Sequence, residues 1–201
     1  MQKIIINHWM NLITKYNSYD DIKLEQIKYG LTGLYMTISK AIIIFIISLL
    51  LNVVKESIIL LLCFNAIRVT SFGIHAKKSW ICLVISIILF IGIPLIIKNI
   101  YLNFTLKLII GCINIIFIYK YSPADTKKRP IVNKKRRYIY KYISTITATI
   151  FVLLSLIIKN NYLINSLIFS LIIQNILISP FTYKICNEPY NNYVNYIKNK
   201  I

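Results

Sequence analysis

Long apolar stretches separated by short polar segments constrain this chain more than any other feature of its sequence. A helix needs about 20 mainly apolar residues to cross the hydrocarbon core of a membrane. Six stretches meet or approach that length, at residues 34–51, 53–67, 80–97, 101–119, 143–158 and 162–181. The pattern predicts an all-α integral membrane protein of about six spanning helices, the last two joined as a hairpin with its turn at Asn160 and Asn161.

The charge balance supports a membrane location. Hydrophobic residues make up 57% of the sequence, yet 24 Lys and Arg residues face only 6 Asp and Glu residues, for a net charge of +18. A soluble nucleic-acid-binding protein would account for the charge but not for the apolar stretches. Basic loops on the cytoplasmic side of a membrane account for both, so we expect contact with membrane lipid and none with nucleic acid.

The positions of the basic residues predict the topology. If the N-terminus is cytoplasmic, 19 of the 24 Lys and Arg residues fall in cytoplasmic segments, and the outer turns hold only Lys55, Lys98 and Lys159. Cytoplasmic loops carry an excess of Lys and Arg. Both termini are therefore expected in the cytoplasm.

The sequence predicts a single polytopic membrane domain, residues 1–201. Its parts are an amphipathic N-terminal segment, four spans, a basic cytoplasmic loop, a helical hairpin and a cytoplasmic tail, at residues 1–30, 34–119, 120–142, 143–181 and 182–201. In the first part, apolar side chains recur at helical spacing from Ile5 to Tyr16, with Trp9 among them. Such a helix can lie in the membrane interface or pack against the bundle, and both arrangements stay open.

The densest group of polar residues lies where the second span ends and the third begins, between Arg68 and Cys82. Polar residues inside or beside spans are costly and are therefore candidates for function. His75 and Cys82 lie seven residues apart, which on one straight helix separates them by about 10 Å along the axis. A hydrogen-bonded pair therefore requires a bend, which Gly73 can supply.

Such a pair would provide a cysteine nucleophile and its base. Ser79 is expected to cap the third span, which places Cys82 in the first turn of that helix, where the helix dipole lowers the pKa of a thiol. His75 would take the proton and leave a thiolate–imidazolium pair. The alternative is a loop histidine beside an inert core cysteine, and Arg68 can equally be a topology anchor that reaches toward the lipid headgroups.

A second polar group follows the fourth span. Asp125 is its one acidic residue, and it can orient His75, cap a turn through Thr126 or pair with a lysine. The basic residues of this group are Lys127, Lys128, Arg129, Lys134, Lys135, Arg136 and Arg137. They are candidates for binding anionic lipid or an acidic peptide, and they also serve as a topology-determining run.

Other hydrolytic chemistries lack their residues. The sequence contains no HExxH zinc motif and no GxxxxGK[ST] nucleotide-binding loop, and it contains no GxSxG motif. Its four cysteines form no CxxC pair. The sequence therefore predicts neither a metal site nor a cofactor.

Together, the two polar groups resemble the accessory gene regulator protein B family of Gram-positive quorum sensing. The residues that carry the resemblance are Arg68, Gly73, His75, Ala76, Cys82, Pro123, Ala124, Asp125, Thr126, Pro130 and Ile131. Residues 29–31 and the plan of six spans with a basic central loop agree as well. One departure is Phe72, because family members often carry two adjacent glycines before the histidine.

The resemblance implies a cysteine endopeptidase of the bacterial cell membrane, with Cys82 as nucleophile and His75 as general base at the cytoplasmic side. The supporting or oxyanion-stabilising candidates are Arg68, Gly73, Ser79 and Asp125. The substrate would be a short amphipathic propeptide with an acidic tail, and cleavage would leave its N-terminal part as a thioester that cyclises to a thiolactone. The rival is a non-enzymatic membrane peptide exporter or adaptor, and homodimerisation stays open.

Overall fold

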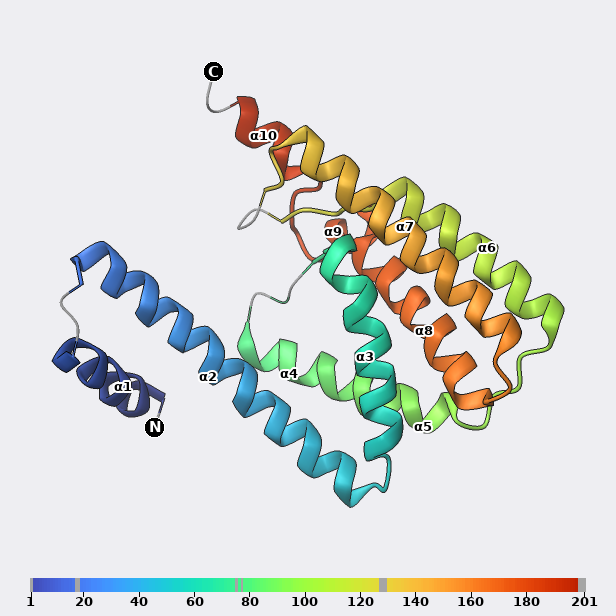
Figure 1. Ribbon diagram of the computed structural model, residues 1–201, viewed down its shortest axis with the longest axis horizontal. Helices are drawn as coiled ribbons and strands as arrows, with labels where there is room; N and C mark the ends of the chain where they lie inside the picture. The colour runs from blue at the N-terminus through green and yellow to red at the C-terminus, as the bar shows by residue number, and fades with distance from the viewer. Residues whose placement is uncertain (1, 17–18, 75, 77, 127–129, 199–201) are drawn as a thin grey trace. The chain divides into compact units, whose positions relative to one another are not determined.

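The computed structural model describes residues 2–16, 19–74, 76, 78–126 and 130–198. The regular elements in these ranges are all helices, which confirms the predicted fold class (Figure 1). The chain divides into two compact units, Met1–Leu51 and Asn52–Ile201.

The first unit consists of two helices that pack against each other, α1 at Gln2–Tyr16 and α2 at Asp21–Leu50. On α1, Ile6 is buried and Trp9 is exposed. The 30 residues of α2 form one continuous helix, which at 1.5 Å per residue is about 45 Å long. It therefore exceeds the hydrocarbon core of a membrane, and it begins within the predicted amphipathic N-terminal segment at residues 1–30.

The second unit is a helical bundle. Its helices are α3 (Val54–Ser71), α4 (Ser79–Ile87), the π-helical segment η1 (Ile88–Gly92), α5 (Ile93–Ile97), α6 (Phe104–Tyr121), α7 (Lys134–Ile157), α8 (Asn161–Ile178), α9 (Pro180–Ile185) and α10 (Asn192–Lys198). The π-helical turn lies just before Pro94, because a proline lacks the N–H and clashes with the preceding turn of a regular α-helix.

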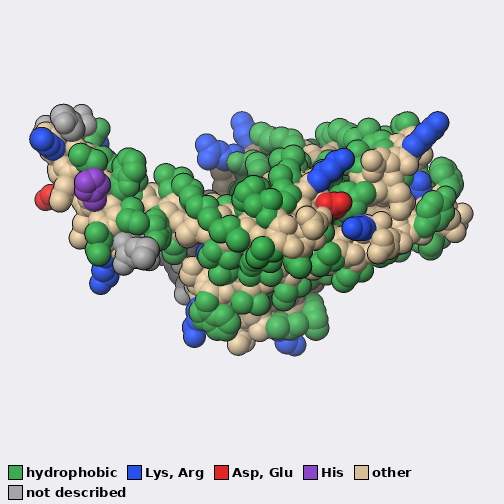
Figure 2. Space-filling model, turned by 90° about the horizontal axis from the view of Figure 1, so that it is seen from below, with side chains coloured by type: hydrophobic (Ala, Val, Ile, Leu, Met, Phe, Trp, Pro, Cys, Tyr) green, Lys and Arg blue, Asp and Glu red, His purple; other side chains and the backbone are tan. Residues whose placement is uncertain are grey.

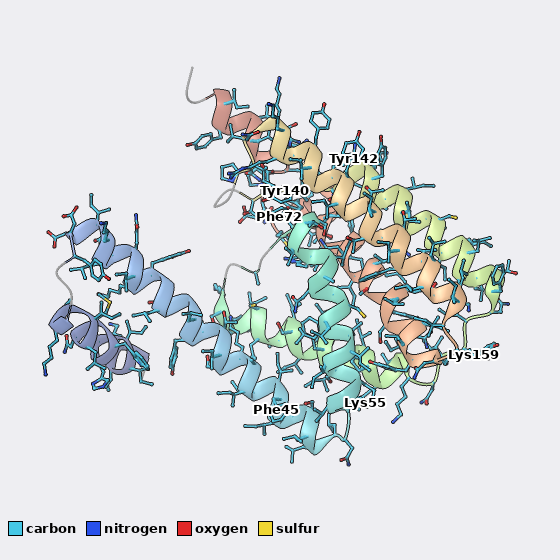
Figure 3. All side chains as sticks on the ribbon, in the orientation of Figure 1. Phe45, Lys55, Phe72, Tyr140, Tyr142 and Lys159 are labelled. Carbon is cyan, nitrogen blue, oxygen red and sulfur yellow. The ribbon has the colours of Figure 1, made fainter. Side chains whose placement is uncertain are left out.

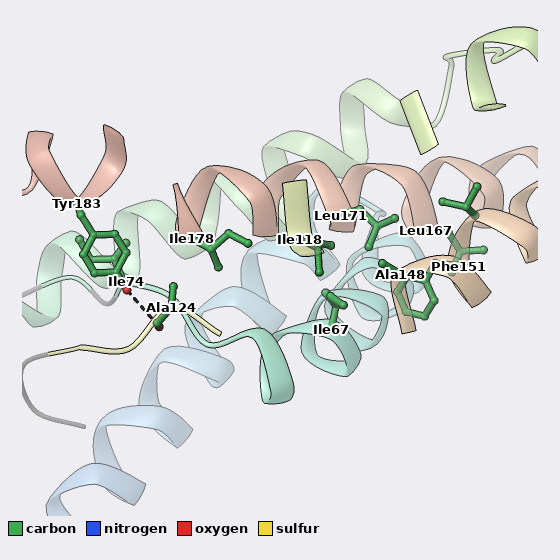
Figure 4. Close-up of a cluster of buried hydrophobic side chains, with 11 residues drawn as sticks. Ile67, Ile74, Ile118, Ala124, Ala148, Phe151, Leu167, Leu171, Ile178 and Tyr183 are labelled. Atoms are coloured by element: carbon green, nitrogen blue, oxygen red, sulfur yellow. Dashed lines mark hydrogen bonds between the residues drawn. The ribbon is translucent and has the colours of Figure 1, made fainter. Parts of the chain in front are cut away.

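The central helix of this bundle is α8, which packs against α3, α6 and α7. The buried core around it is shown in Figure 4 and includes Ile67, Ile118, Ala148, Phe151, Leu167, Leu171 and Ile178. Apolar side chains also cover much of the outer surface (Figure 2). In lipid such a bundle is held by close packing rather than by the exclusion of water.

Within the part of the chain that the structure describes, five helical segments are long and apolar enough to cross a membrane: Asp21–Leu50, Ser79–Ile97, Phe104–Tyr121, Lys134–Ile157 and Asn161–Ile178. They correspond to five of the six predicted spans. The remaining one is α3, whose 18 residues include three charged side chains, Lys55, Glu56 and Arg68. The second predicted span is thus a helix as long as α6 and α8, with Lys55 and Glu56 in its first turn and Arg68 in its last.

The predicted basic loop at residues 120–142 is wrong in its second half, because α7 already begins at Lys134. The Asn133 side chain accepts a hydrogen bond from the Arg136 N–H at 3.3 Å and caps the helix. Lys and Arg are good helix formers, so the basic run can extend the apolar helix toward its N-terminus.

The segments that connect the helices of this unit lie at two opposite ends of the bundle, and hydrogen bonds join segments that share an end. At one end, the Tyr162 hydroxyl donates to the Glu56 carbonyl, and Asn161 Nδ2 donates to the Ile100 carbonyl, both at 2.7 Å. Lys55 and Lys159 lie at this end in Figure 3, and Phe72 and Tyr140 lie at the opposite end. The bundle therefore separates the segments predicted as outer turns from those predicted as cytoplasmic.

We predict that Gly111→Ala lowers the free energy of unfolding by about 1–3 kcal/mol, as overpacking does. A Cβ at this position would lie 2.5 Å from Val152 Cγ1, where α6 meets α7. Thermal unfolding in detergent measures the effect. The matched control is Gly33→Ala, whose added Cβ meets no described atom within 4 Å, and equal melting temperatures for the two variants would contradict the packing argument.

Candidate functional site

The chain leaves α3 through two residues with positive φ. Phe72 has a φ of 58° and Gly73 a φ of 108°. A Cβ on Gly73 would lie 2.9 Å from the Leu177 carbonyl oxygen and 3.0 Å from Arg68 Nη1. Glycine therefore fits this position on both conformational and steric grounds, and the chain bends here as its sequence predicts.

Backbone hydrogen bonds hold this segment between two other parts of the bundle. The Gly73 N–H donates to the Ala124 carbonyl at 2.9 Å, and the Ile74 N–H donates to the Leu177 carbonyl at 3.1 Å. Ala124 belongs to the loop after α6, and Leu177 to the last turn of α8. The two residues directly before His75, Gly73 and Ile74, are therefore held by the loop after α6 and by the end of α8.

Phe72 takes part in the same arrangement. The Ala124 N–H donates to the Ser71 carbonyl at 3.0 Å, and Phe72 and Ala124 form an isolated parallel β-bridge. The Phe72 ring meets the Tyr140 ring of α7 edge to face, with 5.0 Å between the centroids (Figure 3). The departure from the family pattern at position 72 thus supplies a ring contact to α7.

Arg68 lies between residues 72–74, which we call the anchored segment, and the neighbourhood of Cys82. Its Nη2 donates to the Ile74 carbonyl at 2.6 Å, and Cys82 and Tyr183 lie within electrostatic range of its charge. Its Nη1 is buried and has no hydrogen-bond partner among the described residues. A guanidinium turned inward in this way does not reach the lipid headgroups, which argues against the topology-anchor alternative.

Cys82 is half-buried in the first turn of α4, and its N–H donates to the Lys78 carbonyl at 3.1 Å. The helix begins at Ser79, with Lys78 at the N-cap and no side-chain cap hydrogen bond. The predicted cap by Ser79 is therefore wrong by one position. The thiol still lies near the N-terminal, positive end of the helix dipole, as predicted.

His75 lies outside the described residues, and so do Lys127, Lys128 and Arg129. The His75–Cys82 pair therefore stays a prediction. Within the described chain, no group of three His, Cys, Asp or Glu side chains could hold a metal ion.

Asp125 is buried, and its carboxylate accepts hydrogen bonds from three backbone N–H groups. These belong to Asn192 at 2.9 Å, Tyr193 at 2.8 Å and Ile131 at 3.3 Å. Because Asn192 and Tyr193 begin α10, the carboxylate stabilises the positive end of that helix. Asp125 thus docks the C-terminal segment. Its predicted roles toward His75 and the lysines at 127 and 128 stay predictions, because those residues lie outside the described ranges.

Tyr183 of α9, the short helix that follows α8, holds the same loop, the one that contains Ala124 and Asp125. Its buried hydroxyl donates to the carbonyls of Ala124 at 3.2 Å and Asp125 at 2.9 Å, and the first of these bonds is dashed in Figure 4. Burial raises the pKa of the Tyr183 phenol, and the Asp125 carboxylate raises it further. The hydroxyl therefore stays protonated and remains a donor.

The described basic candidates lie on the first turns of α7. Lys134, Lys135 and Arg136 are exposed. The Arg137 guanidinium instead lies over the Tyr193 ring of α10, 3.1 Å from its centroid. Three of these four side chains are therefore available to an anionic partner, and Arg137 has a structural contact.

Sequence reasoning missed the residues of α8 and α9 that hold the site. Gln174 is fully buried, and its Nε2 donates to the Phe72 carbonyl at 2.7 Å. A polar side chain inside a span is a signal that could have identified it. No local pattern marks Tyr183, because its partners lie almost 60 residues earlier in the chain.

A family model described as accessory gene regulator B matches residues 6–178, which contain the whole anchored segment and Cys82. The chain belongs to the accessory gene regulator B family. Membership supports a role in quorum-sensing peptide maturation, and with the apolar helices it identifies a membrane protein. The segment that docks on Asp125, α10, lies beyond the matched residues.

Individual members of the family are similar over most of their length. Accessory gene regulator protein B of Staphylococcus aureus strain MW2 is 33% identical over 182 residues, which are 89% of this chain and 94% of that protein. The protein of strain Newman is 36% identical over 160 residues, 78% of this chain and 82% of its own. An AgrB-like protein of Clostridium acetobutylicum is 30% identical over 90% of this chain and 87% of its own length. No solved structure matches the chain.

We predict that Asp125→Ala releases α10. Hydrogen bonds to a charged group contribute about 1.5–3 kcal/mol, so amide hydrogen exchange in residues 187–198 should become at least about tenfold faster. The control is Asn103→Ala, which removes the 2.8 Å cap bond of α6 to the Leu106 N–H. Unchanged exchange in the Asp125 variant, or an equal rise in the control, would contradict the docking role.

Proposed function

We propose that the chain is an integral-membrane cysteine endopeptidase that cleaves the C-terminal tail from a short propeptide and retains the N-terminal part as a thioester on Cys82. The observation that carries the proposal is the position of Arg68. Its guanidinium binds the carbonyl of Ile74, directly before His75, and lies within electrostatic range of Cys82. One side chain thus binds the backbone directly before His75 and places its positive charge where Cys82 experiences it.

In the proposed reaction, His75 takes the proton of the Cys82 thiol, and the thiolate attacks the scissile carbonyl carbon. The imidazolium returns this proton to the leaving amine as the C–N bond breaks. The products are the released tail, with a new amino terminus, and a thioester on Cys82. The Arg68 guanidinium has an unused Nη1 donor and favours the negative charge that develops during the attack.

A cysteine thiol within the bound peptide then attacks the thioester, closes a thiolactone and restores Cys82. Exchange of one thioester for another is nearly thermoneutral, so the cyclisation requires no ATP. A site at the edge of the membrane excludes water, which would otherwise hydrolyse the thioester.

The proposed substrate is a propeptide with an amphipathic N-terminal part and an acidic tail. The amphipathic part would concentrate on the membrane surface. The exposed Lys134, Lys135 and Arg136 would attract the tail. In the proposed topology these residues and both termini are cytoplasmic. Lys55 and Lys159 lie at the opposite end of the bundle from the start of α7 (Figure 3), which supports the cytoplasmic placement of Lys134, Lys135 and Arg136.

We predict that Cys82→Ala and His75→Ala each abolish propeptide cleavage in proteoliposomes without preventing membrane insertion, because each removes one member of the pair. Cys63→Ala is the matched control, since Cys63 is a half-buried thiol of the same bundle, and it should cleave at the wild-type rate. Normal cleavage by either site variant would refute the pair. Peptide transport without any cleavage by the wild type would favour the exporter.

We predict that changing Lys134, Lys135 and Arg136 together to Gln raises KM more than it lowers kcat, because these side chains bind the tail and not the scissile bond. The increase should shrink at high salt, which screens exposed charges. The matched control changes Lys55, Lys98 and Lys159 to Gln and alters the net charge equally. A loss of kcat at constant KM, or the same KM increase in the control, would contradict tail binding.

A further inference from the structure

We propose that Gln174 is a positioning residue, which holds the peptide group between Phe72 and Gly73 in the orientation that aims the following segment, His75 included, at Cys82. The inference rests on the proposed function. Gln174 lies 102 residues from Phe72 along the chain, in the last turns of α8. It would act through the backbone that precedes the base, without touching the substrate.

The chemistry of the buried amide points to this role. Gln174 has no exposed surface, and its Nε2 donates to the Phe72 carbonyl at 2.7 Å. Its Oε1 has no hydrogen-bond partner among the described residues. A buried polar atom without a partner is costly, and a Met or Leu side chain would fill the same space in a spanning helix without that cost. The hydrogen bond to the Phe72 carbonyl is therefore the advantage that an amide side chain has over an apolar one at position 174.

The Phe72 carbonyl, which accepts that bond, belongs to a peptide group in an unfavourable backbone conformation. Phe72 has φ 58° and ψ −129°, a conformation that glycine adopts readily and that costs other residues about 1–3 kcal/mol. A peptide group in such a conformation tends to rotate toward a more favourable one. The Gln174 amide binds its carbonyl oxygen and opposes this rotation.

The position of Gln174 on α8 makes the restraint directional. Leu177 lies three residues later, on the same face of the helix, and its carbonyl accepts the hydrogen bond from the Ile74 N–H. One helix end thus fixes the backbone on both sides of Gly73. The carbonyl of Leu177 belongs to the backbone, so Gln174 is the half of this restraint that a substitution can remove.

The neighbouring residue provides the contrast. Asn175 is also a buried amide in α8, its Oδ1 also lacks a partner in the described chain, and its Nδ2 donates to Asn114 of α6. It contributes to packing between helices, and its side-chain hydrogen bonds within the described chain go to Asn114 and not to residues 72–74. Gln174→Met and Asn175→Leu therefore each remove the hydrogen bonding of one buried amide from adjacent positions, but only the first removes a bond to this segment.

The test compares these two variants with the wild type in proteoliposomes. We expect Gln174→Met to lower kcat by about tenfold or more, as misplacement of a catalytic group does, with KM within about twofold of the wild-type value. We expect Asn175→Leu to change neither constant by more than about twofold at a similar loss of melting temperature. Wild-type kcat in Gln174→Met, or an equal loss in both variants, would overturn the inference.

Amide hydrogen exchange separates this inference from the proposed function. Exchange at residues 72–76 should become faster in Gln174→Met and stay at the wild-type rate in Asn175→Leu, whether or not the wild type cleaves a propeptide. Absence of cleavage by the wild type would refute the peptidase alone, whereas unchanged exchange in Gln174→Met would refute the positioning role alone. If the Met variant fails to insert, Gln174→Asn, whose amide is one methylene too short to reach, makes the same comparison.

Discussion

The rest of the site depends on the anchoring of the backbone at residues 72–74. Gly73 and Ile74 donate to carbonyls of Ala124 and Leu177, which come from the loop after α6 and from the end of α8. Near a membrane, backbone groups that cannot reach water need partners within the protein. These bonds meet that need and bring the end of α3, the loop and α8 together, so that the backbone directly before His75 is fixed.

Much of the fold could be predicted, because the length of an apolar stretch reports the thickness of a membrane. The start of α7 could not. Positive charges at Lys134 and Lys135 oppose the helix dipole, so the sequence there looks unlike a helix start, and the decisive bond is the cap by Asn133. The charged α3 shows the converse, since Arg68 in its last turn binds the Ile74 carbonyl inside the bundle instead of facing lipid.

Local chemistry identified Gly73, Arg68 and the place of Cys82, because a bend, a buried charge and a helix start depend on neighbouring residues. It could not identify Gln174 or Tyr183, whose partners lie far away in the sequence. Asp125 shows the same limit. An acid among basic residues suggested a partner nearby in the sequence. Its carboxylate does accept a bond from the Ile131 N–H, but its two shorter bonds come from the start of α10. Buried polar groups must find partners, but the sequence alone does not say which.

The central claim is that Cys82 carries the peptide as a thioester, and intact-mass spectrometry of the purified protein mixed with a synthetic propeptide tests it most directly. The account predicts a protein heavier by the mass of the N-terminal peptide fragment, with the addition located on the tryptic peptide that contains Cys82 and removed by neutral hydroxylamine, which cleaves thioesters. Propeptide cleavage by a protein that never shows this addition, or an addition on another residue, would contradict it.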